Sequence, residues 1–238
     1  MPEQAEETGK TIKGVMFVQG RIKTIIDIAM SVLLLFLMAY MLTGQKVHEW
    51  MGTAMLVLFL LHNILNCRWY MGLIKGKYSL YRIMHTAVNF ALLAAMIGIA
   101  VSGTILSQFV VGFLPIHGGM FFARKTHMLC SYWAFLLMSV HLGMHWGIVV
   151  RKIENLAGKA GRGVVWNNIL RLTVIATACY GAYAFIKNNL LSYMLLQNLF
   201  VFFDPDQPLY AFLAEYAAMM AMWACAAYYG AKRYKTQP

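Results

Sequence analysis

Long apolar runs dominate this sequence, and they limit what it can fold into more than any other feature does. The run RIKTIIDIAMSVLLLFLMAYMLTG begins at residue 21, and LYAFLAEYAAMMAMWACAAYYG begins at residue 209. Each approaches the roughly 20 residues that an α-helix needs to cross the hydrocarbon core of a bilayer. The chain is 61% hydrophobic and 12% charged, which lies outside the range of soluble globular domains. We therefore predict an all-α integral membrane protein.

The apolar runs predict a bundle of about six transmembrane helices. Their expected bounds are residues 22–43, 48–67, 82–111, 126–149, 167–187 and 209–230. Residues 1–20 are polar and are expected to form a cytoplasmic tail without a removable signal peptide, whereas residues 21–235 are expected to form a single transmembrane domain. Residues 189–203 are too apolar for a solvated loop, so we expect a helix there, at the outer interface or against the outer ends of the bundle.

Basic residues are distributed unevenly between the two sides of this bundle. Sixteen of the twenty Lys and Arg residues fall in the tails and loops of one side. The positive-inside rule makes that side cytoplasmic and places both termini there, in a multi-pass protein of the cytoplasmic membrane. The same rule accounts for the net charge of +11, so we expect membrane lipid and no nucleic acid as a partner of the basic loops.

Two pairs of histidines, each fourteen residues apart, lie in the second and fourth predicted spans: His48 with His62, and His127 with His141. Fourteen residues at about 100° each return a side chain to within roughly 40° of its first direction, about 21 Å further along the axis. Each pair therefore lies on one face of its helix. The two spans run in the same direction, because one returning span separates them. His48 is then level with His127 near the outer side, and His62 is level with His141 near the cytoplasm.

Two imidazoles at each of two depths are the ligand set of two stacked b-type haems, with one axial ligand from each helix. The small residues Gly52 and Ser131 lie beside the outer pair and leave room for a flat macrocycle. Without a CxxCH motif the haems would be bound non-covalently. A structural zinc is disfavoured, because each level has two ligands and no nearby thiolate or carboxylate completes a tetrahedral set. A histidine within a span can also simply hydrogen-bond a neighbouring helix.

Four stretches of the chain resemble a family of small bacterial cytochrome-b-like membrane proteins, over about residues 20–235. The stretches are HEWMGTAMLVLFLLHNILNCRWY, KGKYSLYRIMHTAVNF, HMLCSYWAFLLMSVHLGMHW and VFFDPDQPLYAFLAEYAAMM. The spacing of the histidines also resembles that of cytochrome b in respiratory bc complexes, which implies a four-helix dihaem core. Members of the family are often encoded near flavin-carrying extracytoplasmic proteins. The resemblance therefore implies electron transfer with an extracytoplasmic redox protein, such as a flavoprotein or a multihaem cytochrome.

Two further histidines are candidates for an extra site. His145 follows His141 by one helical turn and is open to three roles: alternative haem ligand, partner of a haem propionate, or part of a quinone pocket. His85 opens the third span, where the family pattern leads us to expect an Asn-like residue. His85 and His145 can thus build a site of their own, since ionisable groups inside a membrane are rare and commonly functional.

Other polar residues are weaker candidates. Arg68, Arg82 and Arg124 lie at the levels where haem propionates would emerge, although loop arginines are common in any membrane protein. Glu215, near the outer end of the last span, is expected to pair with a neighbouring base or to reach the interface. The alternative is that Glu215 carries protons to a quinone at the outer face.

The sequence thus predicts a dihaem b-type cytochrome that transfers electrons across the cytoplasmic membrane. Its expected partners are a quinone, or another donor or acceptor on the cytoplasmic side, and an extracytoplasmic redox protein. Ligation by two histidines leaves no open iron position, which disfavours oxygen chemistry. Two alternatives stay open: a quinone or ferric oxidoreductase that reacts directly at one haem, and a non-redox anchor or proton-coupled transporter, which would be colourless.

Overall fold

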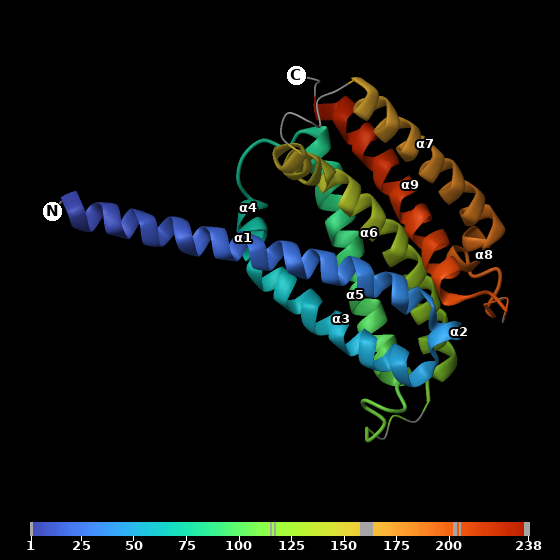
Figure 1. The fold of residues 1–238 in the computed structure, drawn as a ribbon. Coiled ribbons are helices and arrows are strands. Elements are labelled where there is room, and N and C mark those ends of the chain that lie inside the picture. Colours follow the sequence, from blue (N-terminus) through green and yellow to red (C-terminus); the bar gives the residue numbers. More distant parts are fainter. Residues whose placement is uncertain are drawn as a thin grey trace.

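The computed structural model describes residues 2–114, 116, 118–157, 164–201, 204 and 206–235, and every regular element in these residues is an α-helix (Figure 1). The helices are α1 (Pro2–Met38), α2 (Tyr40–Thr43), α3 (Gln45–Leu65), α4 (Cys67–Gly72), α5 (Leu80–Leu106), α6 (Met120–Ala157), α7 (Val164–Lys187), α8 (Leu190–Met194) and α9 (Leu209–Lys235).

Four helices of the described chain are long and apolar enough to cross a membrane. They cover Leu80–Leu106, Met120–Gly147, Asn168–Lys187 and Leu209–Tyr234. The helices given above confirm the all-α class for the described residues, and these four helices support the membrane character of the chain by their length and composition. The expected spans 22–43 and 48–67 are not among the four, because α1 carries several charges close together and α3 has polar residues near both of its ends. The six-span topology and the cytoplasmic termini remain predictions.

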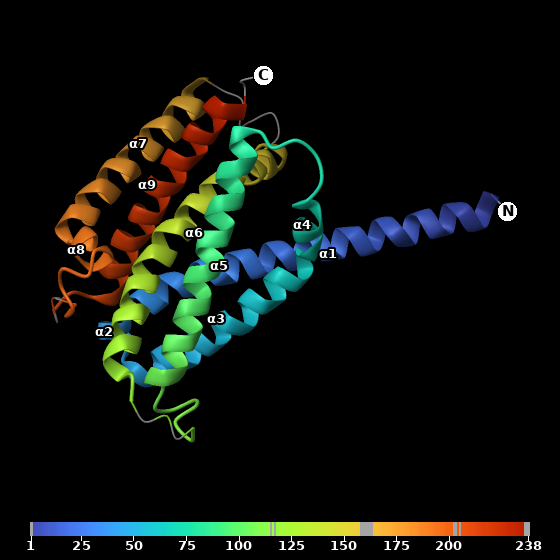
Figure 2. The ribbon, with the colours of Figure 1, turned by 180° about the vertical axis from the view of Figure 1, so that it is seen from behind.

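Four long helices lie side by side in the order α5, α6, α9, α7 (Figures 1 and 2). Fully buried side chains such as Phe135 and Met219 fill this layer. Two glycines allow close helix contacts: a Cβ at Gly143 would meet the Ala224 carbonyl oxygen at 2.1 Å, and a Cβ at Gly181 would meet the Ala218 carbonyl oxygen at 2.3 Å. Small residues at such crossings let helix backbones approach in membrane proteins, so α9 is held closely by both neighbours.

The α1–α3 hairpin crosses one face of this layer and packs mainly within itself (Figure 1). The chain reverses at Gly44, whose φ of 81° suits glycine. Both α3 and α6 begin at the same end of the molecule, beside the loop that follows α5 (Figures 1 and 2). The two helices that carry the paired histidines therefore run in the same general direction, as the sequence predicts.

Helix α1 differs from the prediction, because it is continuous from Pro2 to Met38 and includes residues expected to form a tail. Pro2 occupies the first helical position, which suits its fixed φ angle, and no later proline interrupts the helix. The first residues of α1 extend away from the bundle (Figure 1).

The segment 189–203 also differs from the prediction of one long helix. Only Leu190–Met194 is helical, and Phe202 and Phe203 lie outside the described residues. The chain turns at Leu196, whose φ is 54°, and the indole Nε1 of Trp133 donates to the Met194 carbonyl oxygen at 3.0 Å. Leu190, Tyr193 and Met194 are buried. The short helix thus packs against α6.

Candidate histidine sites

The site predicted to lie near the outer side, called the outer site, contains His48 of α3 and His127 of α6, whose ring centroids lie 6.0 Å apart with planes at 70°. Ser102 of α5 fixes the His127 ring, since Ser102 Oγ and His127 Nδ1 are 3.1 Å apart. The Ser102 hydroxyl donates its hydrogen to the Gly98 carbonyl oxygen at 2.6 Å. Ser102 Oγ must therefore accept from Nδ1–H of His127, which leaves the lone pair of His127 on Nε2.

His48 has an incompletely satisfied environment. The Tyr40 ring meets it edge-on, with centroids 5.1 Å apart, and the Leu37 backbone lies close by. Even so, Nδ1 of His48 is buried and makes no hydrogen bond of acceptable geometry to the described residues. Buried polar groups are normally paired. His48 Nδ1 is an exception, and the Leu37 backbone is its poorly aligned hydrogen-bond neighbour.

Glu49, the next residue of α3, holds the loop after α5 in place. Its carboxylate accepts hydrogen bonds of 2.7–3.2 Å from one side chain and three backbone amides of that loop: Ser107 Oγ, Gln108 N, Phe109 N and Val110 N. Gln45 of α3 donates to the same carboxylate at 3.0 Å. These contacts end α5 at Leu106, short of the predicted 111, because the next amides turn toward Glu49. The loop is thereby fastened to α3 directly beside His48.

The predicted inner site pairs His62 of α3 with His141 of α6, and in the structure each of these rings is held through its own Nδ1 partner. His62 Nδ1 lies 2.8 Å from Asp27 Oδ1 of α1, and His141 Nδ1 lies 2.8 Å from Asn89 Oδ1 of α5. Both oxygens accept, so both rings carry their hydrogen on Nδ1 when neutral and keep Nε2 as a donor to a metal. Metal-ligating histidines are typically oriented by a carboxylate or carbonyl oxygen in this way.

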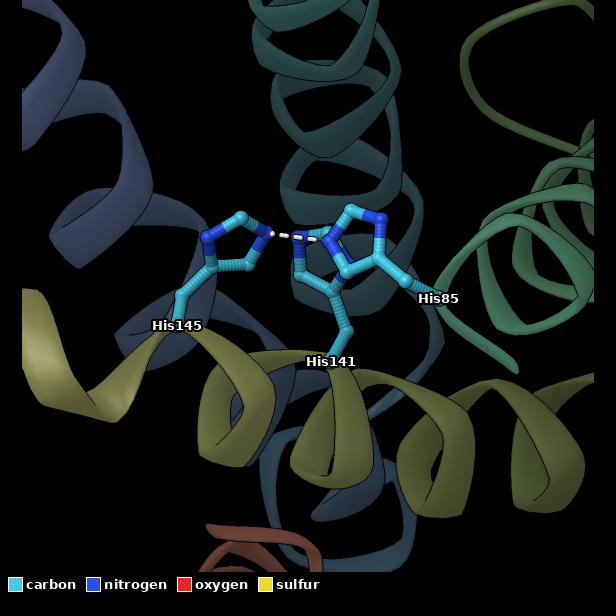
Figure 3. Close-up of side chains that lie close together, drawn as sticks. All are labelled: His85, His141 and His145. Carbon is cyan, nitrogen blue, oxygen red and sulfur yellow. Dashed lines mark hydrogen bonds between the residues drawn. The ribbon is translucent and has the colours of Figure 1, made fainter. Parts of the chain in front are cut away.

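The rings nearest to His141 belong to His85 of α5 and His145 of α6 (Figure 3). Nε2 of His85 lies 3.0 Å from Nε2 of His145. One ring nitrogen from each of the three histidines lies within 4.8 Å of the others, and all three are half-buried. His62 is close enough to His141 for their charges to interact, but the three-histidine cluster does not include it. His85 and His145 thus lie together, as the hypothesis of an extra site requires, and His141 lies beside both of them.

The remaining candidates are distributed as follows. Gly52 faces open space, since a Cβ there would meet nothing within 4 Å, and Ser131 is half-buried on α6. Arg68 and Arg124 are exposed. Arg82 instead holds the α4–α5 connection, because its guanidinium donates to backbone carbonyl oxygens at 2.7 and 3.2 Å and lies 4.2 Å from the centre of the Tyr78 ring.

Glu215 is buried, with 4% of its surface exposed, and it accepts from Lys187 Nζ at 2.5 Å and from Asn188 Nδ2 at 2.8 Å. Pairing with a neighbouring base was the first of the roles considered for this residue, and the geometry agrees with it.

Sequence reasoning missed Ser102, Glu49 and Asn89, which hold the rings or the loop at these sites. Asn89 is four residues from His85 and so lies on the same face of α5, with its Nδ2 3.5 Å from His85 Nδ1. That spacing was visible in the sequence. Glu49 offered no such signal, because its partners lie about sixty residues further along the chain.

Comparison of the chain with protein-family models, with curated proteins and with solved structures found no match. The resemblance to cytochrome-b-like proteins therefore remains a prediction. Function has to be inferred from the histidine sites themselves.

Proposed function

We propose that this protein is a dihaem b-type cytochrome that transfers electrons across the cytoplasmic membrane. One haem would lie between His48 and His127, and the other between His62 and His141. The proposed electron partners are a quinone or another cytoplasmic-side donor or acceptor, and an extracytoplasmic redox protein. The proposal includes six spans with both termini in the cytoplasm, which rests on the distribution of Lys and Arg.

The observation that carries the proposal is that His48 and His127 come together from the two predicted ligand helices, at a spacing compatible with one metal between them. The spacing alone is not specific, because ordinary ring pairs and the His85–His141 pair at 6.1 Å share it. A metal–imidazole bond is about 2 Å long and the nitrogen lies about 1 Å from the ring centre, so two rings on opposite sides of one metal have centroids about 6 Å apart. The centroids of His48 and His127 are 6.0 Å apart. The rings belong to two different helices, α3 and α6, as axial ligands on opposite faces of a macrocycle require.

The inner pair is supported by the hydrogen bonds that its two rings make. Asp27 and Asn89 occupy the two Nδ1 atoms, which leaves Nε2 of His62 and Nε2 of His141 as available ligands. Both helices also carry their second histidine about 21 Å along the axis, on the face of the first. Two haems held at these levels would span much of a hydrocarbon core of about 30 Å.

In this proposal the chain orients its imidazoles and keeps water from the metal, while the haems supply reversible one-electron chemistry. Ser102, Asp27 and Asn89 would raise the basicity of the ligand rings that they bind, which favours the oxidised iron. Two histidine ligands leave no position for oxygen or substrate on the iron. Such a site passes electrons and does not itself transform a bound substrate.

The test is to count haem in the purified protein by pyridine haemochrome, together with a reduced-minus-oxidised spectrum. We expect two b haems in the wild type and about one in His48→Ala and in His62→Ala. His145→Ala is the control, since it removes a histidine of α6 without removing a proposed axial ligand. A colourless wild-type protein, expressed with ample porphyrin, would refute the cytochrome. An unchanged haem count in His62→Ala would refute the inner ligand assignment.

A further inference from the structure

His85 and His145 have no part in either proposed haem, yet their nitrogens are the closest pair in the cluster. We propose that His85, His141 and His145 form a binding site for a divalent transition-metal ion of the zinc class (Figure 3). We further infer that this ion and the inner haem exclude each other, because both use Nε2 of His141. The exclusion rests on the proposed function, whereas the metal site does not.

The spacing of the nitrogens distinguishes the two kinds of ligand. Donors in a tetrahedral zinc site lie about 3.3 Å apart, given bonds of about 2.0–2.1 Å. Two axial ligands of one haem are further apart, about 4 Å, since they lie on opposite sides of the metal. The Nε2 atoms of His85 and His145 are 3.0 Å apart. This pair is therefore spaced to bind one ion from adjacent corners and is too close for a haem between them.

The three ligands come from elements that are held firmly. His141 and His145 are four residues apart and so lie on the same face of α6, one turn from each other. His85 comes from α5, which packs against α6 along its length (Figure 1). Their ring centroids lie 4.7 Å (His141–His145), 4.9 Å (His85–His145) and 6.1 Å (His85–His141) apart. The site therefore forms by small ring rotations, without a change in the helices.

Three neutral imidazoles with a fourth, open position are an established ligand set for zinc. Asn89 Oδ1 already orients His141 through Nδ1, as an outer partner of a metal ligand does. In the metal-free state His85 and His145 share one hydrogen between their Nε2 atoms. When the ion binds, both Nε2 lone pairs must face the metal, so each of the two rings carries its hydrogen on Nδ1 and no net proton is lost. Nδ1–H of His85 would then face Asn89 Nδ2, so the weak 3.5 Å contact between them has to open.

The experiment uses the full chain, purified in detergent from haem-limited cells, treated with a chelator and titrated with Zn²⁺ alone. Bound zinc is counted by mass spectrometry, and Co²⁺ in a parallel titration reports tetrahedral coordination by its absorption. We expect one zinc per wild-type chain and at least a roughly 100-fold weaker affinity in His85→Ala and in His145→Ala. His62→Ala is the matched control and keeps its zinc. Circular dichroism and gel filtration establish that each variant is folded.

Haem counts on the same variants, expressed with ample porphyrin, separate the two proposals. We expect His62→Ala to lose the inner haem and keep zinc, and His85→Ala to lose zinc and keep both haems. His141→Ala should lose the inner haem and the zinc, and keep the outer haem. Zinc that binds wild type no better than the His85→Ala/His145→Ala double variant would overturn the metal site and leave the cytochrome intact. Zinc binding to a chain that never takes up haem would refute the cytochrome alone. One zinc bound beside two haems would overturn the exclusion.

Discussion

Replacing Glu49 with glutamine tests how the outer end of the molecule is held together. Oε2 of Glu49 accepts three hydrogen bonds from residues 107–110, and Oε1 accepts one from Gln108 N and one from Gln45. Glutamine keeps the shape but turns one oxygen into an NH₂ group. The best arrangement places the remaining oxygen at the Oε2 position. The new NH₂ group then faces two donors, and the other three hydrogen bonds lose their charge assistance.

The magnitude follows from those contacts. Hydrogen bonds to a charged group contribute about 1.5–3 kcal/mol each and neutral ones about 0.5–1.5 kcal/mol. Glu49 is only half-buried, so solvent reduces the difference, and the contacts are not additive. We expect Glu49→Gln to lower the free energy of opening the loop by about 2–3 kcal/mol in total. At about 1.4 kcal/mol per factor of ten, the loop amides should exchange roughly 30- to 150-fold faster.

Hydrogen exchange with mass spectrometry, on protein in detergent, measures this change in peptides that cover residues 107–111. Gln45→Leu is the matched control, because it removes a donor to the same carboxylate without removing a contact to the loop. Its loop peptides should exchange as in the wild type. Equal exchange in the wild type and in Glu49→Gln would refute the role of Glu49 as the residue that holds this loop.

Three other substitutions have defined outcomes. Asn89→Leu removes the acceptor that orients the inner α6 histidine, so we expect about 10- to 100-fold weaker retention of the inner haem with the outer haem unchanged, measured by haemochrome counts. Lys187→Met leaves the buried Glu215 carboxylate without its cation, and thermal unfolding in detergent should show a loss of about 1–2 kcal/mol, because solvent already screens the half-exposed Lys187. The loss should be smaller for Glu215→Gln, and equal losses would contradict the stated burial. Gly143→Ala places a methyl group 2.1 Å from a carbonyl oxygen of α9 and should reduce the yield of folded protein in gel filtration. Gly52 faces open space, so Gly52→Ala should fold normally and bind less of the outer haem.

The outer histidine pair could be predicted because two simple regularities determine it. Helical periodicity places His48 and His62 on one face of a helix, and His127 and His141 on one face of another. Chain reversal then makes the two helices parallel. Neither regularity depends on details of packing, and the structure brings His48 and His127 together as expected.

The inner cluster could be predicted only in part, because its register depends on how α5 and α6 cross. His85 and His145 are sixty residues apart, and periodicity within either helix says nothing about which turns meet. Hydropathy likewise did not indicate that the polar first residues continue α1, since polarity excludes burial in lipid but does not exclude a helix. From its place in the sequence, Arg82 is a candidate partner of a haem propionate. In the structure its guanidinium instead donates to backbone carbonyl oxygens of the α4–α5 connection, a contact that no sequence pattern indicates.

The division of the four paired histidines between two parts of the molecule affects how the protein is assembled. His48 and His62 lie on the α1–α3 hairpin, which meets the layer of α5, α6, α9 and α7 over a small area, whereas His127 and His141 lie within that layer. Each proposed prosthetic group would then join the hairpin to the layer by two coordinate bonds. In a cell short of porphyrin the hairpin would be held to the layer only by its share of the apolar core and by the hydrogen bonds of Glu49, so we expect it to open more often and to be exposed to quality-control proteases. The abundance of the protein would thereby follow the supply of its cofactor.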